Sequence, residues 1–241
     1  MIYHLDITTS TNDDARDEKY REGDVVWADF QSAGRGQRGH EWHSRKGENL
    51  TFSVVLEPTF VAIVEQFSVS EVVALSLVDM LAEYGIEAKI KWTNDIYVGD
   101  KKIAGILIEH KLQGPSLART VVGIGLNVNQ MEFSAELPNP ISMAQAAGRD
   151  FDREKILQDL TRSLMARYAQ LREGQGEELQ RDYHARLYRR GEEHCYALPD
   201  GSRFRGTIRG VEPTGALRIE NEHGEQLSFL FKEVEFLIDG R

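Results

Sequence analysis

Apolar residues recur along the chain in patterns that predict helices and strands. Apolar positions at helical spacing over residues 64–84, followed by Gly85, predict a long helix that stops at the glycine. The run at 120–127 is almost continuously apolar, so we expect that strand to be buried. The predicted strands are 25–30, 49–56, 88–92, 96–98, 103–109 and 120–127, and the predicted helices are 10–21, 64–84, 152–172 and 176–189.

The pattern changes near residue 192, where short alternating segments follow the last predicted helix. Three turns rich in glycine interrupt these segments, at 199–201, 213–215 and 222–224. Such spacing is typical of a small antiparallel barrel or sandwich. We therefore predict an α+β domain over residues 1–190 and a small all-β domain over residues 191–241.

Composition narrows the possible functions. The 241 residues carry a formal net charge of −10, which makes general binding to nucleic acid unfavourable. The single cysteine, Cys195, excludes an internal disulfide, and we interpret it as a small, half-buried apolar side chain. The chain has neither a leader-like start nor a run of about 20 apolar residues, so we expect no membrane contact and a cytoplasmic location.

Several common cofactor signatures are missing from the sequence. There is no glycine-rich run ending in Gly-Lys-Ser/Thr and no His-Glu-x-x-His. Nor is there a Gly-x-Gly-x-x-Gly that joins a strand to a helix with a later acid, since the glycines at 34, 36 and 39 lie within a segment predicted to be a loop. The seven histidines form no pair at metal-ligand spacing. We therefore expect no zinc, no NAD and no pyridoxal phosphate.

The segment from Gly34 to Trp42 is the first candidate for chemistry. Its three glycines allow the backbone to approach a ligand closely, and Arg35 and Arg38 offer planar donors for phosphate or carboxylate. On composition alone, a flexible, solvated loop without a binding role is an equally good interpretation. Residues 31–48 as a whole are predicted to be a loop.

The segment from Lys91 to Gly105 is the second candidate. Asn94 and Asp95 lie at the mouth of a predicted hairpin, where a carboxylate can bind Mg²⁺ or a ribose hydroxyl. Lys102 precedes the small pair Ala104 and Gly105, so its side chain can reach a ligand through the gap. The alternative, a routine β-turn with solvated lysines, is the commoner outcome for such a segment.

Two further segments have both a structural and a functional interpretation. Residues 10–13 read as a helix start, with Ser10 as N-cap, yet helix N-termini also bind anions. Glycines at 123 and 125 either pack in a core strand or let a ligand approach it, and Asn127 follows them.

These four segments occur in the order found in biotin protein ligases, and the chain resembles that family over roughly residues 5–130 by motif. Residues 192–241 look like the family's small SH3-like C-terminal domain. The resemblance implies a central mixed or antiparallel sheet with flanking helices, as in the class II synthetase-like catalytic fold of biotin and lipoate ligases. It also implies that ATP and Mg²⁺ activate biotin as biotinyl-5'-AMP, which is then transferred to a lysine of a biotin carboxyl carrier protein.

The family's residue roles carry over where residues match. On the biotin side, the resemblance implies that Gly105 lets the ring system lie close to the backbone, and that Lys102 contacts the biotin carboxylate and the α-phosphate. The implied lining of the ureido pocket is Ser10, Thr11, Asn12 and Gln31.

On the nucleotide side, Arg35 and Arg38 would lie in a mobile loop that orders over the acyl-adenylate, together with Gly34 and Gly36. Trp42 would help to form the closed site. The residues implied to face the nucleotide are Asn94, Asp95, which is also the implied Mg²⁺ ligand, and Asn127, which would lie near the adenine.

The sequence departs from the family pattern at three places. Gln37 replaces an arginine, which could be compensated by Arg38 or could loosen the hold on the intermediate. Thr93 stands where proline is usual, and we expect only the turn to change. The first motif begins at residue 10, which leaves no room for the DNA-binding domain of regulatory members, so we expect no repressor activity.

Three competing interpretations stay open. A lipoate or octanoate ligase or transferase shares the expected fold but uses a different arginine-glycine motif. A nucleic-acid-binding module would use the Gly-Arg loop to bind RNA, and a scaffold protein would carry no chemistry. A homodimer is possible, but the sequence does not decide the oligomeric state.

Overall fold

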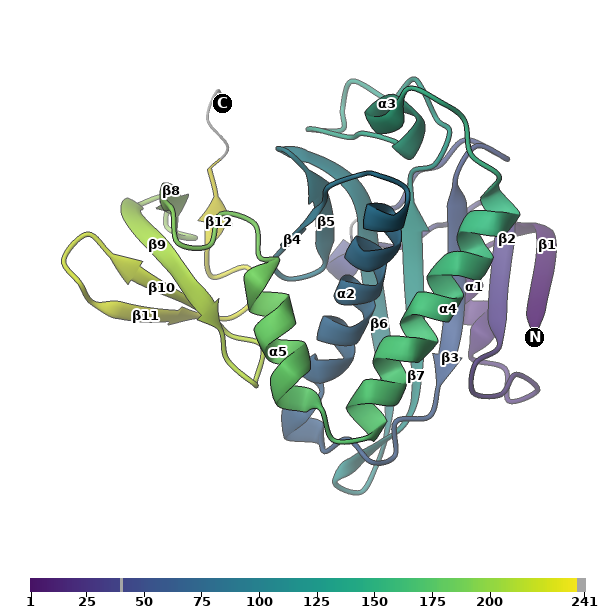
Figure 1. Cartoon of the computed structure of the whole chain (residues 1–241), viewed down its shortest axis with the longest axis horizontal. Helices are drawn as coiled ribbons and strands as arrows, with labels where there is room; N and C mark the ends of the chain where they lie inside the picture. Colours follow the sequence, from purple (N-terminus) through teal and green to yellow (C-terminus); the bar gives the residue numbers. More distant parts are fainter. Residues whose placement is uncertain (40, 238–241) are drawn as a thin grey trace.

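The structure is a computed structural model that describes residues 1–39 and 41–237, and for Arg38 the backbone alone. A large sheet carries helices on one face, and a smaller sheet lies beside it, next to the end of α5 (Gly176–Ala185) (Figure 1). This is the predicted α+β fold with an additional all-β part. Among the described residues, no helix is both long and apolar enough to cross a membrane.

The large sheet has seven strands in the order β1-β2-β3-β7-β6-β5-β4. β1 and β2 are parallel and the remaining neighbours are antiparallel, so the sheet is mixed. Its strands are β1 (Ile2–Thr8), β2 (Val25–Gln31), β3 (Leu50–Leu56), β4 (Lys89–Lys91), β5 (Asp95–Val98), β6 (Lys101–Gln113) and β7 (Ser116–Leu126).

Burial of the central strands follows from their apolar runs. Every residue of β3 is buried, and so is every residue of β7 from Thr120 onward. These two strands are neighbours in the middle of the sheet, and side chains on both of their faces are therefore covered. The expectation that residues 120–127 form a buried strand is confirmed.

Three long helices cover one face of the sheet (Figure 1). α2 (Phe67–Glu83) lies against α4 (Arg153–Arg172) and α5, and it buries one apolar residue after another in the main core. A short 3₁₀ turn, η2 (Ile63–Glu65), precedes α2. Gly85, with a φ of +77°, follows the end of α2, as the sequence predicts.

The predicted helix 10–21 is wrong in length, because α1 spans only Thr11–Ala15. After Ala15 the chain turns, and the Asp17 carboxylate accepts a hydrogen bond from the Lys19 backbone N–H at 2.9 Å. The Arg119 side chain donates to the carbonyl oxygens of Ala15, Asp17 and Tyr20 at 3.0–3.1 Å. A side chain distant in sequence therefore satisfies the carbonyls that a longer helix would have used.

Sequence patterns also missed two elements, β1 and the short helix α3 (Met143–Ala147). β1 is the exposed edge of the large sheet, and it was missed although its residues from Tyr3 to Thr8 alternate regularly between apolar and polar. Another short element, η1 (Gln37–Gly39), lies inside the predicted loop 31–48. α5 ends four residues earlier than predicted.

The smaller sheet is antiparallel, with the order β11-β10-β9-β8-β12. Its strands are β8 (Glu193–Ala197), β9 (Arg203–Val211), β10 (Leu217–Asn221), β11 (Gln226–Phe229) and β12 (Glu235–Phe236). Ile208, Val211, Leu217 and Ile219 belong to the same buried cluster as the main core. In addition, Trp92 Nε1 donates to the Gly215 carbonyl at 2.9 Å, so the smaller sheet is attached beside the second candidate segment.

Candidate active site

One cavity of about 400 Å³ brings together the four candidate segments, although they are spread over residues 10–127. Its lining residues come mainly from α1, the loop after β2, and the strands β5, β6 and β7. The predicted site residues that line it are Ser10, Thr11, Asn12, Gln31, Arg35, Gly36, Trp42, Asn94, Asp95, Lys102, Gly105 and Asn127.

A polar network forms one end of the cavity. The Gln31 Oε1 accepts hydrogen bonds from the Thr11 backbone N–H at 2.7 Å and from the Thr11 hydroxyl at 3.0 Å. The buried Ser53 Oγ lies 2.6 Å from Asn12 Oδ1 and 2.8 Å from Thr11 Oγ1. The network fixes largely buried hydroxyl and amide groups at the cavity wall, which suits recognition of a small polar group. Ser53 was missed because it lies inside an apolar strand.

The two glycines of β7 make room for side chains of the site. A Cβ at Gly123 would lie 2.2 Å from Asn12 Oδ1, and a Cβ at Gly125 would lie 2.2 Å from Cε2 of Trp42. Both distances are far below van der Waals contact. The open choice between core packing and close approach is therefore decided: these glycines admit Asn12 and the Trp42 ring.

A register shift between β5 and β6 places Lys102 in the cavity. Ile96 pairs with Ala104 but Tyr97 pairs with Lys102, which leaves Ile103 without a partner across the ladder. Without this shift, residues 102 and 105 would point to opposite faces of the strand. With it, the Lys102 Nζ lies 3.3 Å from the Cβ position of Gly105 and 2.7 Å from Asp95 Oδ1.

The space over Gly105 is taken by side chains. A Cβ on Gly105 would lie 3.1 Å from Cζ3 of Trp42, and the Lys102 Nζ is 5.7 Å from the centre of the Trp42 ring. Asn94 is fixed beside them because its Nδ2 donates to the Ile106 carbonyl at 2.8 Å. The arrangement presents one cation, one carboxylate and one aromatic ring at the same point.

Arg35 lies at the rim, paired with acidic residues. Its Nη2 is 2.7 Å from Asp13 Oδ1, and its guanidinium is 3.3 Å from both Glu109 carboxylate oxygens. Glu109 also accepts from Asn12 Nδ2 at 2.9 Å and from Arg16 at 2.7 Å. Glu109 therefore connects the glycine loop to the polar network, and sequence reasoning did not single it out.

The remaining loop residues have different positions. Gly34 does not line the cavity; its carbonyl accepts from the Trp42 backbone N–H at 2.9 Å, and the two residues join the ends of the loop. The Gln37 Oε1 is buried and has no hydrogen-bond partner among the described residues. The Arg38 side chain, for which a role was predicted, lies outside the described part of the chain. The whole of His40 lies outside it as well.

Part of the cavity wall comes from segments without a recognisable motif. The Lys102 backbone N–H donates to the Asn139 carbonyl at 2.7 Å, and Asn127 Nδ2 donates to the Ile141 carbonyl at 3.0 Å. The residues contributed by this segment are Phe133, Leu137, Pro138, Asn139 and Pro140. No pattern in residues 133–140 predicts this position, because it depends on contacts with strands far away in sequence.

Lys91 and Phe231 also line the cavity, and neither was predicted as a site residue. The Lys91 Nζ lies 4.9 Å from the centre of the Phe236 ring and 5.3 Å from that of Tyr97. Burial among these groups lowers the pKa of Lys91. Residues of the C-terminal sheet, and of the loops between its strands, thus lie at or next to the cavity beside the large sheet. The Trp92–Thr93 peptide bond, next to Lys91, is cis.

Comparison with known proteins shows which family the sequence resembles. Residues 2–127 match the model of the biotin/lipoate A/B protein ligase family. The chain is 31% identical to the bifunctional ligase/repressor BirA of Bacillus subtilis, over 93% of this chain and 70% of that protein. It is 34% identical to the biotin–[acetyl-CoA-carboxylase] ligase of Paracoccus denitrificans, over 84% of this chain and 86% of that protein.

Solved structures extend the likeness to the whole chain. The biotin protein ligase of Aquifex aeolicus, in complex with biotin and ATP, superposes with a TM-score of 0.81 at 27% identity and covers 97% of each chain. The likeness therefore includes the C-terminal sheet as well as the large one. The chain belongs to the biotin/lipoate A/B protein ligase family.

Proposed function

We propose that this protein is a biotin–[biotin carboxyl carrier protein] ligase that uses ATP to form biotinyl-5'-AMP and then transfers biotin to a carrier lysine. The observation that carries the proposal is the single cavity in which the four motifs meet. The relatives and the Aquifex aeolicus structure, whose names refer to biotin ligases, support biotin as the acid.

In the first step, a carboxylate oxygen of biotin attacks the α-phosphorus of ATP, an O–P bond forms and pyrophosphate leaves. Two anionic groups must approach each other, so the reaction needs a fixed cation at their meeting point. Lys102 has that role in the proposal, because its ammonium projects into the cavity and Asp95 holds it at 2.7 Å. Arg35 would add a second cation once it leaves Asp13 and Glu109.

The polar network would bind the ureido group of biotin. Thr11, Asn12 and Gln31 offer donors and acceptors there, and Ser10 lies next to them in the cavity wall. The nucleotide would lie on the side of Asn94, Asp95 and Asn127. Trp42 would cover the reacting centre, and its ring already lies over Gly105 and Gly125.

Mg²⁺ enters the proposal with ATP. Mg²⁺ commonly binds one or two carboxylates together with substrate phosphates. Asp95 fits this pattern, because it is a carboxylate in the cavity with only one oxygen paired to Lys102. Bound there, Mg²⁺ would supply positive charge that neutralises the phosphates.

In the second step, the amine of the carrier lysine attacks the acyl carbon of the mixed anhydride, an amide bond forms and AMP leaves. A mixed anhydride hydrolyses in water, so the glycine loop that carries Arg35, Gly36 and Arg38 would close over it. The expected carrier is the biotin carboxyl carrier domain of a carboxylase. The net charge of −10 gives no support to DNA binding, so we propose ligase activity without repressor activity.

The test is to incubate the protein with ATP, Mg²⁺ and one acid at a time, namely biotin, lipoate or octanoate, and to detect acyl-adenylates by mass spectrometry. We expect biotinyl-adenylate alone. Lipoyl- or octanoyl-adenylate as the main product would overturn the assignment of the acid while keeping the reaction class. No adenylate with any acid would overturn the proposed function.

A further inference from the structure

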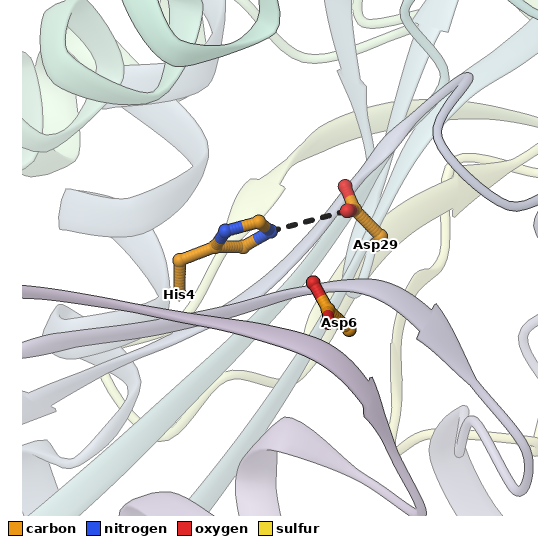
Figure 2. Close-up of side chains that lie close together, drawn as sticks. All are labelled: His4, Asp6 and Asp29. Atoms are coloured by element: carbon orange, nitrogen blue, oxygen red, sulfur yellow. Dashed lines mark ion pairs between the residues drawn. The ribbon is translucent and has the colours of Figure 1, made fainter.

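A second group of polar side chains lies away from the cavity, on the outer strands of the large sheet. His4 and Asp6 belong to β1 and Asp29 belongs to β2. Each offers a ligand atom, and the three atoms lie within 4.8 Å of one another. Figure 2 shows the His4 ring directed at Asp29, with the Asp6 carboxylate beside them.

Strand geometry explains why these residues meet. His4 and Asp6 are two positions apart, so their side chains project from the same face of β1. In the parallel register, Leu5 pairs with Ala28 and Ile7 with Phe30, which puts Asp6 level with Asp29. The grouping depends on pairing between strands, and for that reason the spacing of histidines along the sequence did not reveal it.

Two of the three side chains are already held in position. The His4 ring stacks on the buried Trp27 ring, with centroids 4.2 Å apart and planes at 23°. The His4 Nε2 lies 3.2 Å from Asp29 Oδ2. The other Asp29 oxygen, Oδ1, is bound by Arg153 Nη2 at 2.9 Å. Partners of this kind orient metal ligands and commonly surround metal sites.

One carboxylate of the group has no partner among the residues that the structure describes. Within the described part of the chain, the Asp6 carboxylate has no hydrogen bond and no ion pair, although it lies near a second carboxylate. Arg153 offsets the charge of Asp29 alone. A bound cation would remove the repulsion between Asp6 and Asp29, and because His4 and Asp6 are exposed their side chains can adjust to it.

We propose that His4, Asp6 and Asp29 form a binding site for a divalent transition-metal ion, with zinc as the best fit. One imidazole nitrogen and two carboxylate oxygens are ligands that Zn²⁺ accepts, with water completing four-fold coordination. Ligands about 2 Å from a tetrahedral ion lie about 3.3 Å apart, close to the 3.2 Å between His4 Nε2 and Asp29 Oδ2. The Asp6 ligand atom lies within 4.8 Å of the other two.

Such an ion would join the edge strand to the rest of the sheet. β1 is bonded on one side only, and beyond its end lie Ser10, Thr11 and Asn12. β2 ends at Gln31, which bonds Thr11. The ion would therefore stabilise the two strands whose ends hold the polar network of the cavity, and it would do so independently of the proposed ligase reaction.

The experiment is a calorimetric titration of Zn²⁺ into protein without an affinity tag or nucleotide, for the wild type, His4→Ala and Asp6→Asn. We expect one tight zinc site in the wild type. In His4→Ala and in Asp6→Asn the zinc affinity should be lower by about tenfold or more. The matched control is His194→Ala. His194 and Glu192 form a pair at the same 3.2 Å but belong to no group of three potential ligands among the described residues.

Thermal unfolding gives a second measurement, because an ion that binds only the folded state raises the Tm. Zn²⁺ should raise the Tm of the wild type and of His194→Ala, and much less that of Asp6→Asn. Excess Mg²⁺ should not compete, since it prefers oxygen ligands and octahedral geometry. Equal zinc affinity in all four proteins, the absence of a tight site in the wild type, or displacement of zinc by Mg²⁺ would each overturn the proposal.

Discussion

Lys102 and Asp95 form an ion pair of 2.7 Å inside the cavity, between adjacent strands β6 and β5. The pair exists because the ladder between these strands shifts by one residue at Ile103. Asp95 restricts the motion of the lysine side chain, which otherwise has four rotatable bonds. The ammonium is thus held at one place in the cavity, and in the proposed reaction such preorganisation would make electrostatic catalysis effective.

Replacing Lys102 with alanine should remove the cation at the proposed meeting point of biotin and ATP. We expect adenylate formation to slow by about 10²–10³-fold, the usual effect of deleting one preorganised charge or donor. A single-turnover assay with labelled ATP measures this step directly. Lys101→Ala is the matched control, because Lys101 is an exposed neighbour in β6 that does not line the cavity. Equal rates for Lys102→Ala and Lys101→Ala would show that the role is assigned wrongly.

Arg35→Ala should mainly affect retention of the intermediate. The arginine is paired with Asp13 and Glu109 at the rim, so its loss leaves Lys102 in place but loosens the loop. We expect faster release of biotinyl-adenylate into solution with little change in its formation. Both quantities can be measured by rapid filtration and mass spectrometry.

Arg16→Ala is the control for Arg35. Arg16 contacts the same two carboxylates, at 3.0 Å and 2.7 Å, but does not line the cavity. It should release the intermediate at the wild-type rate. If Arg16→Ala releases it as fast as Arg35→Ala, the effect comes from exposing the acidic pair and not from the loop arginine.

Gly125→Ala should displace the Trp42 ring, because the new methyl would lie 2.2–2.6 Å from three ring atoms. Overpacking of this kind costs about 1–3 kcal/mol, and biotin should bind more weakly. Denaturant unfolding and equilibrium binding report the two effects. Gly176→Ala, with open space around its Cβ at the start of α5, should leave binding unchanged. Unaltered biotin affinity in Gly125→Ala would argue that Trp42 does not shape the binding site.

Glu71 should make stability depend on pH. Its side chain in α2 is 4% exposed, and burial raises the pKa from 4.5 to about 8. Because the folded-state pKa is above the unfolded value, the stabilising contribution is complete below about pH 4.5 and is lost as pH rises through about 8. Glu71→Gln stays neutral, so its Tm advantage over the wild type should grow from about pH 5 to about pH 9.

The control for this pH dependence is Glu83→Gln, which changes an exposed carboxyl near the end of the same helix. Its Tm difference from the wild type should vary little over the same interval. A Glu71→Gln difference that stays constant with pH would mean that Glu71 titrates normally in the folded state.

The sequence by itself determined the local elements and most of the candidate site. The apolar spacing over 64–84, the turn glycine at 85 and the buried run at 120–127 specify α2 and β7, because each depends on neighbouring residues. The motif residues also converge as expected. For α2 and β7, burial pattern and backbone preference act over neighbouring residues and the prediction agrees with the structure, whereas the helix predicted over 10–21 is too long and β1 was missed.

Other features were decided only by the tertiary structure. The helix ends at Ala15, and Arg119, from a strand distant in sequence, donates to the carbonyls of Ala15, Asp17 and Tyr20 in the turns that follow. The cavity wall at 133–140 depends on pairing with Lys102. The link from Glu109 to Arg35 joins residues more than 70 positions apart. Such contacts leave no periodic pattern in the sequence.

The register shift at Ile103 is the clearest feature that only the tertiary structure decides. In a regular strand Lys102 would face away from Gly105, and nothing in the local sequence marks the shift. The outer strands provide a second such feature, since His4, Asp6 and Asp29 meet only through the pairing of β1 with β2. The sequence therefore supplied the chemical groups, and the pairing of strands decided which groups share a face, because side-chain direction follows from register and not from residue identity.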